Sequence, residues 1–159
     1  MSQVPTWKRT LSGSEFVYQT YQLNKELGRI LANKPKKYKQ NYTDEIIRTA
    51  LSAMKHLVIA DGIYMSKYSL EKDYLLRRKC LQAARGEVAD VAIACYVFLE
   101  IVRAHDYAAE GEHREDIAKL YDQEMKIGEM CETCYKLIGG VMKSDTEIYS
   151  KYIRPGKKG

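Results

Sequence analysis

The fold is decided by residues 69–105, which read SLEKDYLLRRKCLQAARGEVADVAIACYVFLEIVRAH. Apolar side chains return every three or four residues in this stretch, a spacing typical of a helix packed along one stripe. Ser69 is a suitable N-cap, no proline interrupts the run, and its one glycine, Gly86, costs only about 1 kcal/mol relative to alanine. The expected stripe is Leu70, Tyr74, Leu81, Ala84, Val88, Val91, Cys95, Phe98 or Leu99, and Val102. A helix about 55 Å long follows, and it needs partners of similar length.

Length and composition limit the possible classes of protein. The chain has 159 residues, enough for one hydrophobic core, and strand signals are nearly absent, so we predict an all-α domain. It has no run of 18 apolar residues and no signal peptide, so we expect a cytoplasmic protein without membrane contact. Its four cysteines are then expected to be reduced, and its net charge of +5 allows a nucleic acid or another acidic partner.

Three further segments have helical periodicity, which predicts helices over residues 14–32, 43–61 and 113–143. Ser12-Gly13-Ser14-Glu15 fits a capping box, and Thr43 is a suitable N-cap for the second helix. The inward side chains expected from these segments are Phe16, Thr20, Leu23, Leu27 and Ile30 or Leu31; Ile46, Ile47, Ala50, Leu51, Met54, Leu57 and Val58; and Ile117, Leu120, Tyr121, Ile127, Cys131, Tyr135, Ile138 and Met142.

Short connections between these helices favour an up-and-down antiparallel four-helix bundle, which we place at residues 12–144. A loose arm carrying Lys8 and Arg9 is predicted at residues 1–11, and a basic C-terminal tail at residues 145–159.

The sequence offers little catalytic chemistry. Cys131 and Cys134 have a metal-like spacing, but zinc needs a second pair of ligands, so two core cysteines are the simpler interpretation. Glu124 falls on the inward stripe of the last helix, where a paired carboxylate or an edge position explains it better than a catalytic acid. Phosphate loops, nucleophile elbows and histidine pairs at i, i+4 are absent. We therefore predict no enzyme activity, no cofactor and no metal site.

Basic residues gather in the loop that we expect after the first helix, where Pro35 ends that helix, and again on the 69–105 helix. One interpretation is a solvated helix surface balanced by the chain's 21 acids. The other is a phosphate-binding surface, with Tyr38 and Tyr42 available to stack on bases. Charge in the sequence alone does not separate the two.

Three short segments resemble a known family. Lys34-Pro35-Lys36-Lys37-Tyr38, a helix ending in Ile59-Ala60-Asp61-Gly62, and Leu137-Ile138-Gly139-Gly140-Val141-Met142-Lys143-Ser144 are similar to segments of one family of small four-helix bundles. That family holds the accessory variability determinant of diversity-generating retroelements and the large-ribosomal-RNA intervening-sequence protein. The resemblance spans roughly residues 16–144.

The resemblance implies a non-enzymatic protein that forms a ring-like homo-oligomer, typically a pentamer. In the retroelement branch, which Gly139-Gly140 and the basic character favour, the ring binds template RNA and docks on the reverse transcriptase; the ligand class extends to DNA or an RNA/DNA hybrid. The basic positions that match, taken as a charged surface, are Lys34, Lys36, Lys37, Lys39, Arg48, Arg77, Arg78 and Arg85. The alternatives are a ribosomal-RNA-type bundle, an interaction module without a nucleic-acid role, and a metal or redox protein using Cys131 and Cys134.

Overall fold

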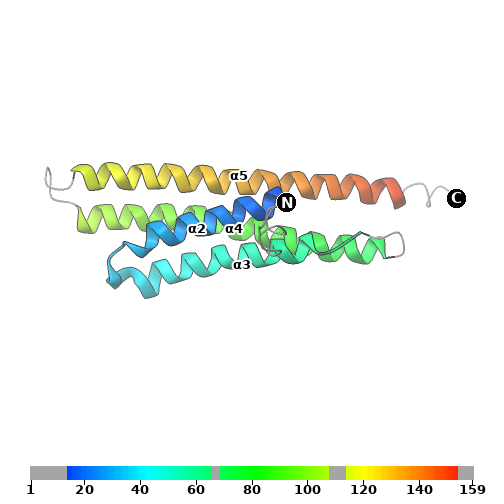
Figure 1. Ribbon diagram of the computed structural model, residues 1–159, viewed down its shortest axis with the longest axis horizontal. Coiled ribbons are helices and arrows are strands. Elements are labelled where there is room, and N and C mark those ends of the chain that lie inside the picture. The colour runs from blue at the N-terminus through cyan, green and yellow to red at the C-terminus, as the bar shows by residue number, and fades with distance from the viewer. Residues whose placement is uncertain (1–13, 66–68, 108–113, 154–159) are drawn as a thin grey trace, which may run out of the picture.

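The computed structural model describes residues 14–65, 69–107 and 114–153, and over these residues it is all-helical, without a strand (Figure 1). The helices, labelled as in Figure 1, are α2 (Glu15–Ala32), α3 (Asp44–Asp61), α4 (Leu70–Asp106) and α5 (Arg114–Ile153). The predicted all-helical fold with four helices is thus confirmed. None of the described helices combines the length and the apolar run that crossing a membrane requires.

Helix α4 is central to the packing, as its sequence predicts. Ser69 is its N-cap, and every predicted stripe position from Tyr74 to Val102 is buried, including both Phe98 and Leu99. Helix α4 contacts α3 on one side and α5 on the other, and α2 contacts the same two helices. All four helices therefore share one core.

Each helix contributes at least one large, fully buried side chain to the core. Leu23, Leu57, Phe98 and Ile138 come from α2, α3, α4 and α5 and are each 0% exposed. Burying a side chain of this kind stabilises a fold by roughly 1.5–3 kcal/mol. The stripe predicted for the first helix is also confirmed, with both Ile30 and Leu31 buried.

The basic segment after α2 is helical and not an open loop, which corrects the expectation. Pro35 breaks the chain direction (φ −54°, ψ 136°), and a 3-10 turn at Lys36–Tyr38 and a π-helical turn at Lys39–Thr43 lead directly into α3. Thr43 directly precedes α3, as predicted, but its backbone is itself helical and its hydroxyl donates to the Lys39 carbonyl at 3.2 Å, so its side chain does not cap the free amides of α3. The aromatic rings of this segment pack on Phe98, which holds the turns against the core.

Helix α5 continues to Ile153, ten residues beyond the predicted end, so much of the predicted tail is helix. The extension covers the first turns of α4: Tyr149 stacks on Tyr74 with ring centroids 4.2 Å apart, and Thr146 lies 3.1 Å from the Tyr74 hydroxyl. The predicted arm at residues 1–11, the turn at 108–112, the capping residue Ser12 and residues 154–159 lie outside the described residues. Ser14 is the N-cap of α2, and its hydroxyl donates to Asp61.

Some predicted inward side chains are exposed. Tyr121 and Tyr135 are more exposed than predicted, because the buried stripe of α5 runs through Gln123 and Cys134 instead, although one face of the Tyr135 ring is covered by Arg85. Helix α3 packs inward through Ile46, Leu57 and the small residues Ala50, Ala53 and Ala60. The helix consequently keeps a second, exposed apolar face, formed by Ile47, Leu51, Val58 and Ile59.

Candidate nucleic-acid interface

A small hollow lies beside the turns that join α2 to α3. Its volume is about 270 Å³, and three lysines, Lys34, Lys36 and Lys39, line it; we call it the lysine hollow. Thr43 and Asp44, where α3 begins, also contribute to the lining. Pro35 and the two helical turns after it hold the lysines around this one opening.

The three lysines differ in their surroundings. Lys34 is half-buried and its Nζ donates to Gln123 Oε1 at 2.8 Å, which ties the connection to α5. Burial, together with the neighbouring charge of Lys119, lowers the pKa of Lys34. Lys36 and Lys39 are exposed, and within the described part of the chain neither side chain has a hydrogen-bonding or ion-pair partner. Two ammonium groups are thus available to a phosphate.

Lys37 and the tyrosines are used inside the fold. The Lys37 Nζ donates to Asp106 at the end of α4 at 2.6 Å; this bond raises the pKa of Lys37 and lowers the pKa of Asp106. The Tyr38 hydroxyl donates to the same carboxylate at 2.7 Å. Tyr38 is buried and Tyr42 half-buried, and both rings pack on Phe98. The expected base-stacking role is therefore wrong for Tyr38.

Arg48 lies alone on the surface of α3. Its Nη1 donates to Glu45 at 3.0 Å, one turn earlier on the same helix, and both side chains are exposed. Exposed pairs of this kind contribute about 0–1 kcal/mol, so the guanidinium can leave its partner at little cost.

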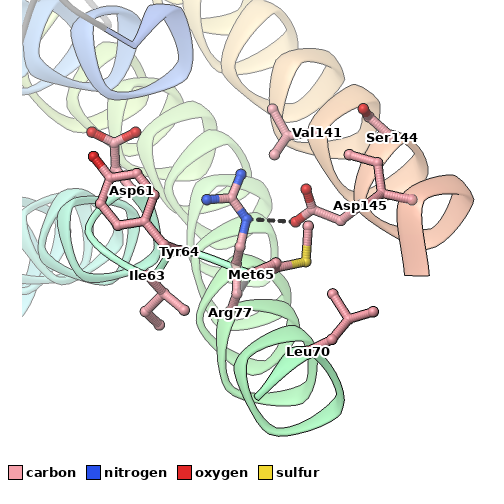
Figure 2. Close-up of a pocket in the computed structure, with 10 residues that line it drawn as sticks. Asp61, Ile63, Tyr64, Met65, Leu70, Arg77, Val141, Ser144 and Asp145 are labelled. Carbon is pink, nitrogen blue, oxygen red and sulfur yellow. Dashed lines mark hydrogen bonds and ion pairs between the residues drawn. The ribbon is translucent and has the colours of Figure 1, made fainter. Parts of the chain in front are cut away.

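Arg77 joins three helices. Its Nε donates to Asp145 Oδ2 on α5 at 2.6 Å (Figure 2). Its Nη1 donates to the Ala60 carbonyl at the end of α3 at 2.9 Å. The side chains of Arg77 and Asp145 are only 16% and 7% exposed. The Arg77 guanidinium therefore links α3, α4 and α5 and is not free to bind a phosphate.

Arg78 and Arg85 also face α5. Arg78 Nη1 donates to the Thr146 hydroxyl at 3.0 Å and to the Tyr74 hydroxyl at 3.1 Å. The Arg85 guanidinium lies 4.2 Å from the centroid of the Tyr135 ring, a cation–π contact, and its buried Nε has no hydrogen-bond acceptor among the described residues. A methyl group on Gly139 would lie 3.4 Å from Arg85 Nη2, so the glycine leaves room for this stack.

The eight predicted positions do not form one patch. Lys37 contacts Asp106 at the end of α4, whereas Arg77 precedes Asp106 by 29 positions on the same helix, a separation of about 44 Å. The lysine hollow therefore lies far along the bundle from Arg77 and Arg78, while Arg85 lies nearer the middle of α4 and Arg48 belongs to neither group.

The remaining chemistry of the chain lies in its core. Cys95, Cys131 and Cys134 are buried free thiols, and burial raises the pKa of Cys95 and of Cys131 to about 12, which makes both poor nucleophiles. In the part of the chain that the structure describes, no three His, Cys, Asp or Glu side chains are grouped to hold a metal. Glu124 is half-buried beside Glu100; burial first, and then this neighbouring carboxylate, raises its pKa to about 7.

Sequence reasoning missed the partner of Arg77. Asp145 fell in the predicted tail, although it follows Ile138 and Met142 at helical spacing and is buried as they are. An acidic residue that continues an apolar stripe is the signal that identifies such a partner.

No family model matches the chain, and the searches of curated proteins and of solved structures gave no significant match. Membership of the retroelement accessory family therefore stays a prediction.

Proposed function

We propose that this protein is a non-enzymatic accessory protein that binds nucleic acid through the lysine hollow. The observation that supports this proposal is the grouping of Lys34, Lys36 and Lys39 around one opening, with two of the three ammonium groups exposed. Lysines of this kind bind phosphate as point charges and release counterions from the nucleic acid. The resemblance stated above adds that the ligand is the template RNA of a diversity-generating retroelement.

The same proposal includes protein partners. It takes the bundle to be up-and-down and antiparallel, to assemble into a ring-like homo-oligomer, most simply a pentamer, and to dock on a reverse transcriptase. The exposed apolar face of α3, with Ile47, Leu51, Val58 and Ile59, supports a protein contact, because apolar patches on a soluble surface often mark interfaces. A ring would also repeat the lysine hollow and so strengthen a modest contact by multivalency.

Binding to a structured RNA, followed by fluorescence anisotropy at several salt concentrations, tests the nucleic-acid part. Replacing both Lys36 and Lys39 with glutamine should weaken binding and reduce the slope of log affinity against log salt by about 2, one for each lost phosphate contact. The matched control is the same double change at Lys72 and Lys143, which are also exposed and lie outside the hollow.

Equal losses in the two double variants would mean that the charge acts only as a diffuse field. No binding by the wild-type protein would leave the alternative, an interaction module without a nucleic-acid role, as the better description. Light scattering tests the assembly separately, since a clean monomer of 18.3 kDa would contradict the ring. A reverse transcriptase gene and a template repeat beside this gene would support the retroelement branch over the ribosomal-RNA branch.

A further inference from the structure

A second and larger hollow lies at the other end of the bundle, where α3 ends between α4 and α5 (Figure 2). Its volume is about 580 Å³, and we call it the distal hollow. Met65 and Leu70 contribute apolar side chains beside the Arg77–Asp145 pair, and Val141 and Ile148 contribute further ones from α5. Ile148 lines this hollow and is 39% exposed, so a segment bound in the hollow would bury further apolar surface of this side chain.

We propose that the N-terminal segment of the same chain, residues 1–13, occupies the distal hollow with Trp7 as its anchor. The described chain begins at Ser14, whose hydroxyl donates to Asp61, and Asp61 itself lines the hollow. The preceding residues therefore join the fold at the rim of the cavity. This proposal is independent of nucleic-acid binding and uses no residue of the lysine hollow.

The segment before Ser14 is long enough for Trp7 to span the α5 wall of the cavity. Trp7 lies seven positions before Ser14, a stretch that spans up to about 23 Å when extended. The α5 wall, from Val141 to Ile148, covers only about 10 Å. Tryptophan is also the best aromatic partner for a guanidinium, and Arg77 lies in the lining.

The charges of the two parts are complementary. Residues 1–13 contain Lys8 and Arg9 and no acidic residue. Among the described residues, the charged side chains that line the distal hollow are two carboxylates, Asp61 and Asp145, and one guanidinium, Arg77, which gives these residues a formal charge of −1. A basic apolar segment fits this cavity better than an acidic ligand does.

Tryptophan fluorescence of the full chain tests the proposal directly, because Trp7 is the only tryptophan in the sequence. In the folded protein its emission should be blue-shifted relative to the urea-unfolded protein, and quenching by acrylamide should be several-fold weaker. Ile148→Lys should shift the emission to the red and restore quenching. Met125→Lys is the matched control, since Met125 is an exposed apolar residue of the same helix that lies outside the lining of the hollow.

Several outcomes would overturn the proposal. Emission and quenching of folded wild-type protein equal to those of the unfolded chain would show that Trp7 is not buried. The same small response to Ile148→Lys and Met125→Lys would show that Trp7 is buried elsewhere. Burial that disappears on dilution would assign the cavity to the segment of a second copy. If circular dichroism shows that Ile148→Lys does not fold, Leu70→Gln on α4 serves as the second variant, with the same expected red shift.

Discussion

The lysines at the α2–α3 connection and the arginines on α4 carry the same charge but have different surroundings. Lys36 and Lys39 extend into solvent beside a hollow, whereas Arg77 and Arg78 donate to residues of α5, and Arg85 stacks on one of its tyrosines. The difference follows from chemistry, because a planar guanidinium with several donors can bridge helices, and a hydrated ammonium on a flexible stem cannot do so equally well. A basic residue in a sequence therefore indicates a binding surface only once its internal partners are known.

Of the changes that test this difference between lysines and arginines, removing the carboxylate that holds Arg77 should lower stability the most. Asp145→Ala leaves a mostly buried guanidinium without its partner, so we expect the free energy of unfolding to fall by about 3 kcal/mol. Urea unfolding followed by circular dichroism measures this loss. Glu45→Ala, which breaks the exposed pair with Arg48, is the control and should cost less than about 1 kcal/mol. Similar losses in both variants would contradict the structural role of the arginine group.

Loss of the stack of Arg85 on Tyr135 should give the next largest fall in stability. Arg85→Ala should lower the free energy of unfolding by about 1–2 kcal/mol through loss of a partly desolvated cation–π contact. Arg85→Lys keeps the charge but loses the planar stack, so urea unfolding should show a loss close to that of the alanine variant. Full stability in the lysine variant would mean that only the charge matters at this position.

Glu124, a half-buried carboxyl on α5, should make the stability of the protein depend on pH. Its pKa of about 7 in the folded protein lies above the ordinary value of 4.5, so the folded state binds more protons and its stability falls as pH rises from about 4.5 to about 7. Glu124→Gln should abolish this fall and raise the free energy of unfolding at pH 8 by about 1 kcal/mol, after allowance for solvent screening. Urea unfolding at pH 5 and pH 8 measures the change. An identical pH dependence in both proteins would argue against a raised pKa of Glu124 beside Glu100.

The exposed lysines should give the smallest effect on stability. Replacing Lys36 and Lys39 together with alanine should change the free energy of unfolding by no more than about 0.5 kcal/mol, because neither has a partner within the described residues. The same urea experiment measures it. A loss above about 1 kcal/mol would mean that these lysines stabilise the fold, as the arginines of α4 do.

The inward stripes of α2 and α4 could be predicted from the sequence, although α4 also carries exposed apolar side chains such as Ile93 and Val97. The stripes of α2 and α4 match their buried faces because apolar spacing and burial agree there. The apolar residues of α3 do not all point inward, since α3 approaches its neighbours through alanines, and only the packed structure decides which side faces the core.

The candidate site was predictable only in part. The lysine-rich turn was recognisable from its composition, but the bonds that occupy Lys37 and Arg77 join residues 69 and 68 positions apart in the chain. Sequence spacing within one helix carries no information about such contacts. The same holds for the end of α5, because it extends to cover a part of α4 that lies far away in the chain.

The unequal lengths of the helices have a consequence for motion. Helices α4 and α5 have 37 and 40 residues, whereas α2 and α3 have 18 each, so the outer turns near Tyr74 and Tyr149 have fewer helical neighbours than the middle of the bundle. Backbone amides in regions with few buried contacts exchange their hydrogens through small local openings, and those in a packed core exchange only on global unfolding. Deuterium uptake should therefore fall steadily along α4 from Leu70 toward Phe98, so that the helix opens from its first turns inward.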